Sequence, residues 1–381
     1  MHSELKYCCH LLYFPFAYLM NRVKVLLDCF RRVPFDEKKI LILTHDLGGG
    51  TAKYIDSIKN GDTIIIKNIE YIWHIGYKVE YDNQITYITD SQMKRIINSH
   101  YEMVVINSLV KMTQIDELIS LLVQNKKKHD TTKYIYLVHD YHAICPNFNL
   151  VYNKKYCGLV CEKCNNTKPI VYGSKKRIEI SEWRAMWKGL FDVCEEIRCF
   201  SNSSKDIINV VYPEFINKIT VIPHTIEELP GMCDIQNTNI PVVGFFGIIN
   251  NTAKGLYQTR DLIAEINSQI SIVFVGSKEE EIGVKKSNIT YMGRYDRYNL
   301  IDIINKRHIN IAIFPSIAPE TFSFLVSELM QSGIKILSFD IGAQGEKVKK
   351  YNNGKVFDTC QQMSDYVNSY YALHREEESV D

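Results

Sequence analysis

Two glutamates in the C-terminal half have the spacing of a ligand-binding pair. The segment 319–328 reads PETFSFLVSE and follows a β-branched run. We expect a helix to begin here, with Glu320 in the loop at its mouth and Glu328 about two turns into it. The backbone N–H groups of Thr321 and Phe322 would face the same ligand, because a helix start favours negative charge such as a diphosphate. Carboxylates at these positions suit vicinal hydroxyl groups.

The acid pair alone does not separate binding from structure. Glu320 could merely complement the helix dipole, and Glu328 could be solvated. A second signal is Lys254, which precedes Gly255 and comes after the apolar run 242–246. A lone Lys-Gly at a helix start is usually a surface feature, and only the position after this run makes Lys254 a candidate.

The N-terminal half contains a glycine-rich loop. Residues 44–51 read THDLGGGT, so the backbone at Gly49 and Gly50 could approach a phosphate or a sugar without side-chain obstruction. The same residues partly match a dinucleotide fingerprint, with Glu70 about twenty residues further on, but Lys53 occupies the place of the third glycine. A bare turn is the third interpretation.

Two histidines follow strand-like runs. His139 closes the run 134–139, where it could donate a hydrogen bond to a sugar hydroxyl or stabilise developing charge. A histidine bonded within the fold is the alternative. His224 follows Pro223 at the end of the first half, and we expect only a structural role for it.

Four cysteines lie within twenty residues and include one CxxC: Cys145, Cys157, Cys161 and Cys164. Four thiolates could close a structural zinc site. The irregular spacing of the first two and the single CxxC argue against it. Other cysteines lie in apolar surroundings, which is typical of a reducing compartment and predicts an intracellular protein.

The elements that must position these residues alternate between short β-branched runs and helix-like stretches, which predicts an α/β fold with parallel strands. We predict strands at 40–44, 63–66, 103–107, 134–139, 197–201 and 219–223, and then at 242–246, 270–275, 289–292, 309–314, 334–339 and 355–357. The polar stretch 227–241 fits a linker. The predicted parts are an apolar and basic N-terminal segment (1–35), two domains (36–226 and 240–360), and a C-terminal helix with an acidic tail (361–381).

Composition sets limits on function. The 381 residues are 46% hydrophobic and 23% charged with a net charge of +1, which is typical of a soluble globular protein and gives no reason to expect nucleic-acid binding. Residues 7–20 are apolar, but they are shorter than the roughly twenty residues of a membrane span and lack the features of a secretory signal. With the arginines and lysine that follow, they form either an interfacial helix on anionic membranes or a helix packed on the core.

With these motifs the sequence resembles a retaining glycosyltransferase of the two-domain GT-B class, in the family called group 1 or family 4. In that family two acids with this spacing follow a strand. The second carboxylate, here Glu328, holds the nucleotide ribose, and the first, here Glu320, lies near the donor sugar and phosphates. The segment 243–247 with Lys254 is similar to the strand, loop and lysine that contact the donor diphosphate. Further matches at 275–276, 293–295, 314–316 and 339–343 extend the resemblance over nearly all of residues 240–358.

The resemblance also covers the first half, where the loop with Gly49 and Gly50 is similar to the family's first loop, and His139 to the histidine beside the donor sugar. It implies two Rossmann-like domains facing across a cleft and a hexose-type sugar moved from a nucleoside-diphosphate sugar. It implies neither a cofactor nor a protein nucleophile, because the leaving diphosphate is thought to help deprotonate the acceptor.

The implied setting is assembly of a surface polysaccharide, such as an O-antigen or a capsule, on a glycan or lipid-linked acceptor. The resemblance places this assembly at the inner face of the cytoplasmic membrane. A dinucleotide-dependent oxidoreductase and a non-catalytic membrane-associated scaffold are the alternatives.

Overall fold

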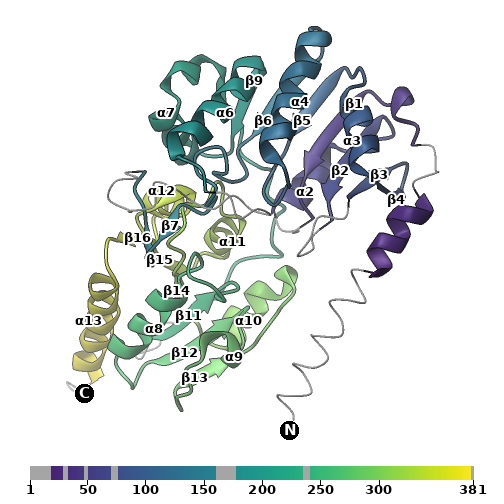
Figure 1. Ribbon diagram of the computed structural model, residues 1–381. Helices are drawn as coiled ribbons and strands as arrows, with labels where there is room; N and C mark the ends of the chain where they lie inside the picture. Colours follow the sequence, from purple (N-terminus) through teal and green to yellow (C-terminus); the bar gives the residue numbers. More distant parts are fainter. Residues whose placement is uncertain are drawn as a thin grey trace. The chain divides into compact units, whose positions relative to one another are not determined.

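The computed structural model describes residues 19–28, 33–46, 50–69, 76–159, 177–234 and 241–378, with side chains as far as residue 370. The chain forms two compact units (Figure 1). The first unit takes its described residues from 1–148, 167–199 and 208–222. The second unit takes them from 149–166, 200–207 and 223–381. Each unit is built around its own sheet.

The first unit contains an eight-stranded sheet in the order β10-β9-β6-β5-β1-β2-β3-β4. Its strands are β1 (Ile40–Thr44), β2 (Thr63–Asn68), β3 (Tyr77–Tyr81), β4 (Gln84–Ile88), β5 (Met103–Ile106), β6 (Lys133–Leu137), β9 (Glu196–Cys199) and β10 (Ile219–Val221). The six strands predicted from β-branched runs are all present and pair in parallel. Burial on both faces explains why most residues of these runs are apolar.

The hairpin β3–β4 was not predicted. It pairs antiparallel at the edge of the sheet, and its strands alternate buried with half-exposed residues, including charged ones. Asp82 and Asn83 in its turn have positive φ angles of 46° and 59°. Aspartate and asparagine tolerate this conformation, so the turn needs no glycine. The helices of the first unit are α2 (Gly50–Ile58), α3 (Asp90–Ile97), α4 (Ile115–Lys128) and α6 (Ile180–Val193), and α7 (Asn202–Val211) passes from the second unit into the first.

The second unit contains a six-stranded, all-parallel sheet in the order β13-β12-β11-β14-β15-β16. Its strands are β11 (Val242–Phe246), β12 (Ser271–Val275), β13 (Ile289–Tyr291), β14 (Ile311–Phe314), β15 (Lys335–Phe339) and β16 (Gly354–Phe357). All six were predicted. The strand order reverses between β11 and β14, which is the point where open parallel sheets bind ligands at the carboxyl ends of their strands. The hairpin of β7 (Val151–Tyr152) and β8 (Lys155–Tyr156) also belongs to this unit.

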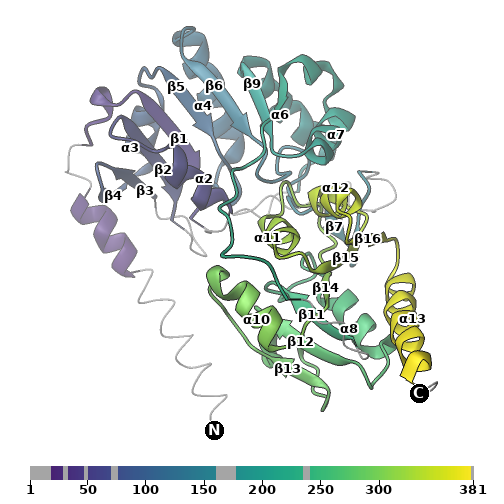
Figure 2. The same ribbon diagram turned by 180° about the vertical axis from the view of Figure 1, so that it is seen from behind.

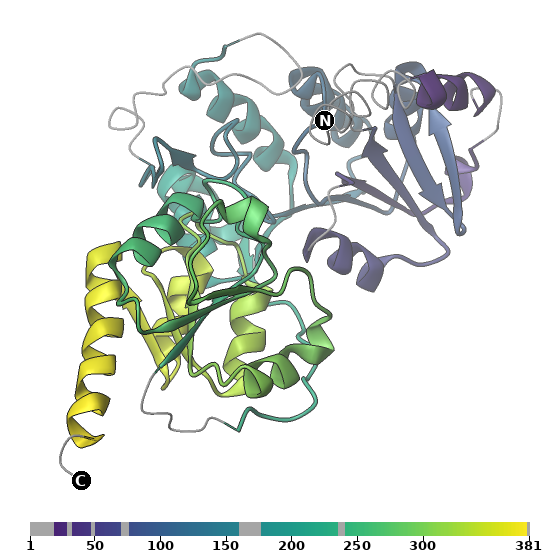
Figure 3. The same ribbon diagram turned by 90° about the horizontal axis from the view of Figure 1, so that it is seen from below.

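Helices cover both faces of this second sheet (Figures 2 and 3). Phe245 and Phe246 are consecutive in β11, so they point to opposite faces and enter two separate apolar clusters. One cluster includes side chains of α8 (Leu256–Glu265), α9 (Glu279–Ile282) and α13 (Cys360–Glu378). The other includes side chains of α10 (Leu300–Lys306), α11 (Phe324–Ser332) and α12 (Gly342–Lys350). The sheet is therefore a rigid base for the loops at its strand ends.

Part of the apolar and basic N-terminal segment is described. Residues 1–18 and 29–32 lie outside the described residues, and residues 19–28 are helical. Val25 is buried, and the Asp28 carboxylate accepts a hydrogen bond of 3.1 Å from the backbone N–H of Tyr87 in β4. An apolar stripe on the same helix is 39% to 70% exposed: Leu19, Met20, Val23, Leu26 and Leu27. No helix among the described residues has the length and apolar character needed to cross a bilayer.

Candidate functional site

Lys254 and Glu320 form an ion pair at the carboxyl ends of two adjacent strands. Lys254 lies in the loop between β11 and α8, and Glu320 lies between β14 and α11. Their Nζ and Oε1 atoms are 2.7 Å apart, and the side chains are 48% and 18% exposed. Burial alone would raise the pKa of Glu320, but the charge and hydrogen bond of Lys254 outweigh it and hold the pKa below its usual value. The same pairing raises the pKa of Lys254.

The loop that carries Lys254 is fixed to the loop that carries Glu320. The carbonyl of Ala253 accepts hydrogen bonds of 3.1 Å from the N–H groups of both Ile317 and Ala318. Gly255 has φ 81°, and a Cβ atom at this residue would lie 1.9 Å from the carbonyl oxygen of Pro315. Only glycine permits this approach, which explains the Lys-Gly pair seen in the sequence.

The backbone of Glu320 is held on both sides by the start of α12. Its N–H donates to Gln344 Oε1 at 2.9 Å, and its carbonyl accepts from the N–H of Ala343 at 2.9 Å. Gly342 has φ 61°, and a Cβ there would lie 2.5 Å from Pro319 Cα. The carboxylate of Glu320 therefore projects from a fixed main chain.

The predicted start of the helix that carries Glu328 is wrong. Helix α11 begins at Phe324, because Ser323 adopts the left-handed conformation (φ 61°, ψ 80°) that ends the loop. Thr321 and Phe322 consequently lie outside the helix, and the first helical N–H groups belong to Phe324 and the residues after it. Glu328 is the fifth helical residue, one turn from the helix start instead of two.

Glu328 is buried, so the alternative of a solvated acid is wrong. Its Oε1 atom accepts a bond of 3.0 Å from Nε of Arg297, which lies between β13 and α10. Arg297 also pairs with the carboxylate of Glu227 and donates to its carbonyl oxygen at 3.0 Å. The pKa of Tyr295 is raised mainly by burial and, to a smaller extent, by the negative charge of Glu328. Sequence reasoning did not select Arg297, although it follows the motif at 293–295.

The second unit thus presents an ammonium, a fixed carboxylate and a buried carboxylate along one end of its sheet. An ammonium can neutralise a phosphate, and carboxylate oxygens can accept hydrogen bonds from hydroxyl groups. We did not predict the two ion pairs that organise these groups.

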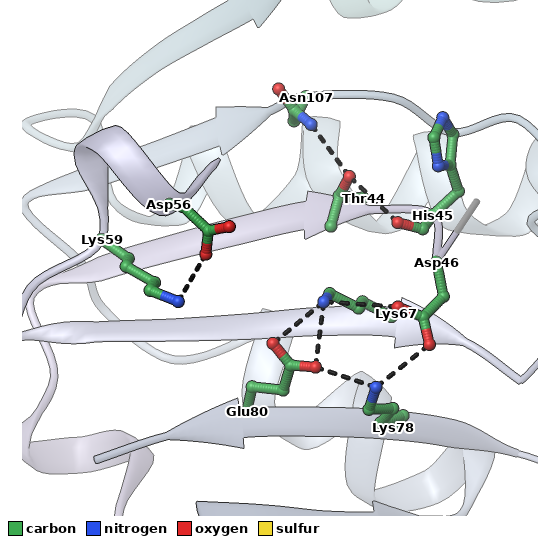
Figure 4. A network of polar contacts seen from close by, with 9 residues as sticks. All are labelled: Thr44, His45, Asp46, Asp56, Lys59, Lys67, Lys78, Glu80 and Asn107. Atoms are coloured by element: carbon green, nitrogen blue, oxygen red, sulfur yellow. Dashed lines mark hydrogen bonds and ion pairs between the residues drawn. The ribbon is translucent and has the colours of Figure 1, made fainter. Parts of the chain in front are cut away.

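In the first unit, Asp46 joins a network of charged side chains from β2 and β3 (Figure 4). Residues 47–49, including Gly49, lie outside the described residues, and Gly50 is the first residue of α2. Asp46 lies 3.0 Å from Lys78 and 3.4 Å from Lys67, and Glu80 lies 2.9 Å from each lysine. Burial would raise the pKa of both acids, but the lysines lower it. Lys67 lies in β2, Lys78 and Glu80 lie in β3, and Asp46 follows β1; this network was not identified from the sequence.

His139 lies two residues beyond β6, in the same unit. Its ring centroid is 5.2 Å from that of Tyr54 in α2. The next residue, Asp140, accepts hydrogen bonds from Ser108 Oγ at 2.5 Å and from the N–H of His142 at 2.8 Å. Burial raises the pKa of Asp140 to about 6, although these bonds oppose the shift. His139 therefore belongs to the first unit, whereas Lys254 and both glutamates belong to the second.

The remaining predicted site residues are the cysteines. Cys145 and Cys157 are partly buried, and Cys161 and Cys164 lie outside the described residues. Within the described ranges, no group of three or more His, Cys, Asp or Glu side chains is arranged to hold a metal ion.

His224 stacks on Phe200 with ring centroids 3.9 Å apart and also packs on Phe322 and Phe324. Burial and the charge of Lys347 lower its pKa to about 4. The ring is therefore a neutral part of an aromatic cluster.

No protein-family model matches the chain, and no curated protein is similar to it in sequence. Solved structures are similar in fold. Alr3699/HepE of Anabaena in complex with UDP superposes with a TM-score of 0.52 at 13% identity over 87% of this chain and 89% of that chain. The apo form of the lipopolysaccharide outer core galactosyltransferase WaaB gives 0.55 at 11% identity over 88% and 90%. These likenesses confirm the predicted α/β fold with two Rossmann-like domains, the GT-B fold.

Proposed function

We propose that the chain is a retaining glycosyltransferase of family 4 type that moves a hexose from a nucleoside-diphosphate sugar to a glycan acceptor. The observation that carries the proposal is the Lys254–Glu320 pair, because it places a cation and a carboxylate together at the strand-order reversal of a Rossmann-like sheet. The fold likeness supports it, since Alr3699/HepE has been solved with UDP and with UDP-glucose.

The geometry suggests how each group would act. The half-exposed ammonium of Lys254 can turn from Glu320 to the diphosphate. Glu320, whose backbone is held in place, would then accept hydrogen bonds from hydroxyl groups of the donor sugar. Glu328 would accept hydrogen bonds from the ribose, oriented by Arg297. Gly49, Gly50 and His139 remain predicted sugar contacts.

Catalysis would come from positioning and charge stabilisation. The leaving diphosphate would help deprotonate the acceptor hydroxyl on the same face of the sugar, so no paired carboxylates of the glycosidase kind are needed. No cofactor enters this scheme.

Thermal shift tests the donor class. UDP, ADP or GDP should raise the unfolding temperature, because a ligand that binds only the folded state stabilises it by mass action, whereas NAD and NADP should not. A shift with the nicotinamide cofactors alone would favour an oxidoreductase, and the absence of any shift would favour a scaffold.

Variants test the residues. Lys254→Ala and Glu328→Ala should remain folded and lose most sugar transfer or donor hydrolysis, and Lys285→Ala, at an exposed lysine of the same unit, should keep both activities. Full activity in a folded Lys254→Ala/Glu328→Ala double variant would refute the assignment.

We propose further that the acceptor is lipid-linked and belongs to a surface polysaccharide, with the protein bound peripherally to the inner face of the cytoplasmic membrane. The exposed apolar stripe of the helix at 19–28 supports this, because an interfacial helix places such a stripe in the lipid and its cations near anionic headgroups. Sedimentation with vesicles of phosphatidylglycerol should recover the protein, and Leu26→Ser/Leu27→Ser should not be recovered. Equal recovery of both proteins would contradict the proposal.

A further inference from the structure

A second lysine, Lys347, lies close to Glu320 and was not identified from the sequence. It projects from α12 toward the start of α11. Its Nζ atom donates to Ser327 Oγ at 2.5 Å and to the carbonyl oxygen of Ser323 at 3.3 Å, and it lies 3.3 Å from the ring centroid of Phe322. Two acceptors and one aromatic face therefore hold the amine in one place.

The titratable groups that face Lys347 come from three elements. Glu320 faces it from the loop before α11, Glu346 from its own helix, and His224 from the segment after β10. Glu320 is already paired with Lys254, and Glu346 is paired with Lys350 at 2.8 Å. Among the described residues, no carboxylate lies within 4.0 Å of Lys347 Nζ. Within the part of the chain that the structure describes, the amine is thus partly buried without an ion-pair partner of its own.

Such a position has an electrostatic consequence. Burial lowers the pKa of Lys347 to about 7, although Glu320 and Glu346 oppose the shift. Near neutral pH the free protein therefore contains both the neutral amine and the ammonium. An anion that arrives at the start of α11 would favour the charged form, because a nearby opposite charge raises the pKa of a lysine.

We infer that Lys347 is a second phosphate-binding cation of the donor site, acting beside Lys254, and that the protein takes up a proton at Lys347 when a nucleoside diphosphate binds. This inference rests on the proposed function. The proton comes from the buffer and adds to the neutral amine, and no bond of the ligand changes.

The sign of the pH dependence follows from this uptake. Below pH 7 the amine is charged in both states, so binding does not depend on its titration. Above pH 7 the free protein loses the proton that the complex retains, so the dissociation constant rises by up to about tenfold per pH unit. The terminal phosphate of the ligand, with a second pKa of about 6, is already ionised in this range.

Calorimetric titration tests the inference with whichever of UDP, ADP or GDP binds most tightly, and with the matching nucleoside. Runs between pH 6.5 and 9, in two buffers of different ionisation enthalpy, measure both affinity and proton uptake. The wild-type protein should show uptake and the rise in dissociation constant. Lys347→Met should weaken diphosphate binding by about tenfold to a hundredfold, the range for one charged hydrogen bond, and leave nucleoside binding unchanged.

Two further variants separate charge from structure. Lys347→Arg should keep the affinity for the diphosphate but lose the dependence on pH, because arginine stays charged. Lys349→Met is the matched control, since Lys349 lies on the same helix, is exposed and pairs with Asp340 at 2.5 Å. It should behave as wild type.

Several outcomes would overturn the inference. It fails if Lys347→Met binds the diphosphate as wild type does. It also fails if this variant loses diphosphate and nucleoside binding equally, which would show a structural role. Absence of proton uptake in the wild-type protein would refute it even if no variant folds. If the wild-type protein binds none of the three diphosphates, the proposed function fails as well, whereas diphosphate binding that is independent of Lys347 removes only this inference.

Discussion

Replacing Gly255 with alanine tests how the loop that carries Lys254 is held. Two costs add. A non-glycine residue in the left-handed conformation costs about 1–2 kcal/mol, and Gly255 has φ 81°. The new Cβ would also lie 1.9 Å from the Pro315 carbonyl oxygen, far inside the 3.0 Å below which real Cβ contacts essentially never occur. The two loops must therefore separate, which breaks the hydrogen bonds to Ala253.

We expect a loss of at least about 3 kcal/mol from the second unit, because the strain and the separated hydrogen bonds add. For a unit of this size, that corresponds to a fall of about 6–12 °C in its unfolding temperature. Lys254 would also move away from Glu320, so affinity for a nucleoside diphosphate should fall. Differential scanning calorimetry and donor titration measure the two effects.

The matched control is Gly189→Ala. Gly189 lies inside α6, and an added Cβ meets nothing within 4 Å, so alanine should stabilise the first unit by about 0.5–1 kcal/mol. If Gly255→Ala kept both the wild-type unfolding temperature and the wild-type donor affinity, the account of this loop would be wrong.

Two other predictions concern Arg297 and the cysteines. Arg297→Ala leaves Glu328 buried without its ion-pair partner, so the second unit should lose about 3–5 kcal/mol by denaturant unfolding, and adding Glu328→Gln should restore part of it. No recovery in the double variant would show that the pair is not coupled. For the cysteine cluster (Cys145, Cys157, Cys161 and Cys164), metal analysis of the purified protein decides between the two interpretations. Four thiolates that close a structural site would hold about one zinc per chain, and a content well below one equivalent would remove the site.

Most strands could be predicted from sequence because a strand buried on both faces is apolar at most of its residues. That condition leaves runs such as 40–44 and 242–246, which the structure reproduces as β1 and β11. The hairpin β3–β4 escaped because Lys78 and Glu80 alternate with buried residues and its turn uses Asp82 and Asn83 in place of glycine. A strand with one exposed face lacks the continuous apolar run from which the other strands were predicted.

The start of α11 was mispredicted for a different reason. Serine rarely adopts positive φ, so nothing at Ser323 marks the end of a loop in the way that glycine would. The left-handed residue costs on the order of 1 kcal/mol, and the surrounding contacts must maintain it. Lys347 supplies one of them by binding the Ser323 carbonyl oxygen. The mispredicted helix start therefore lies at a strained residue, Ser323, next to the candidate site.

The individual site residues were easier to select than their partners. Lys254, Glu320 and Glu328 stand in recognisable local patterns, but Lys254 and Glu320 are 66 residues apart and meet only because β11 lies beside β14 in the sheet. Arg297 reaches Glu328 across 31 residues for a similar reason. Strand order is a property of the whole sheet, so no local pattern encodes these pairs. Strand order also decides which charged side chains surround a ligand. Lys347 could therefore be identified as a site residue only from the folded structure.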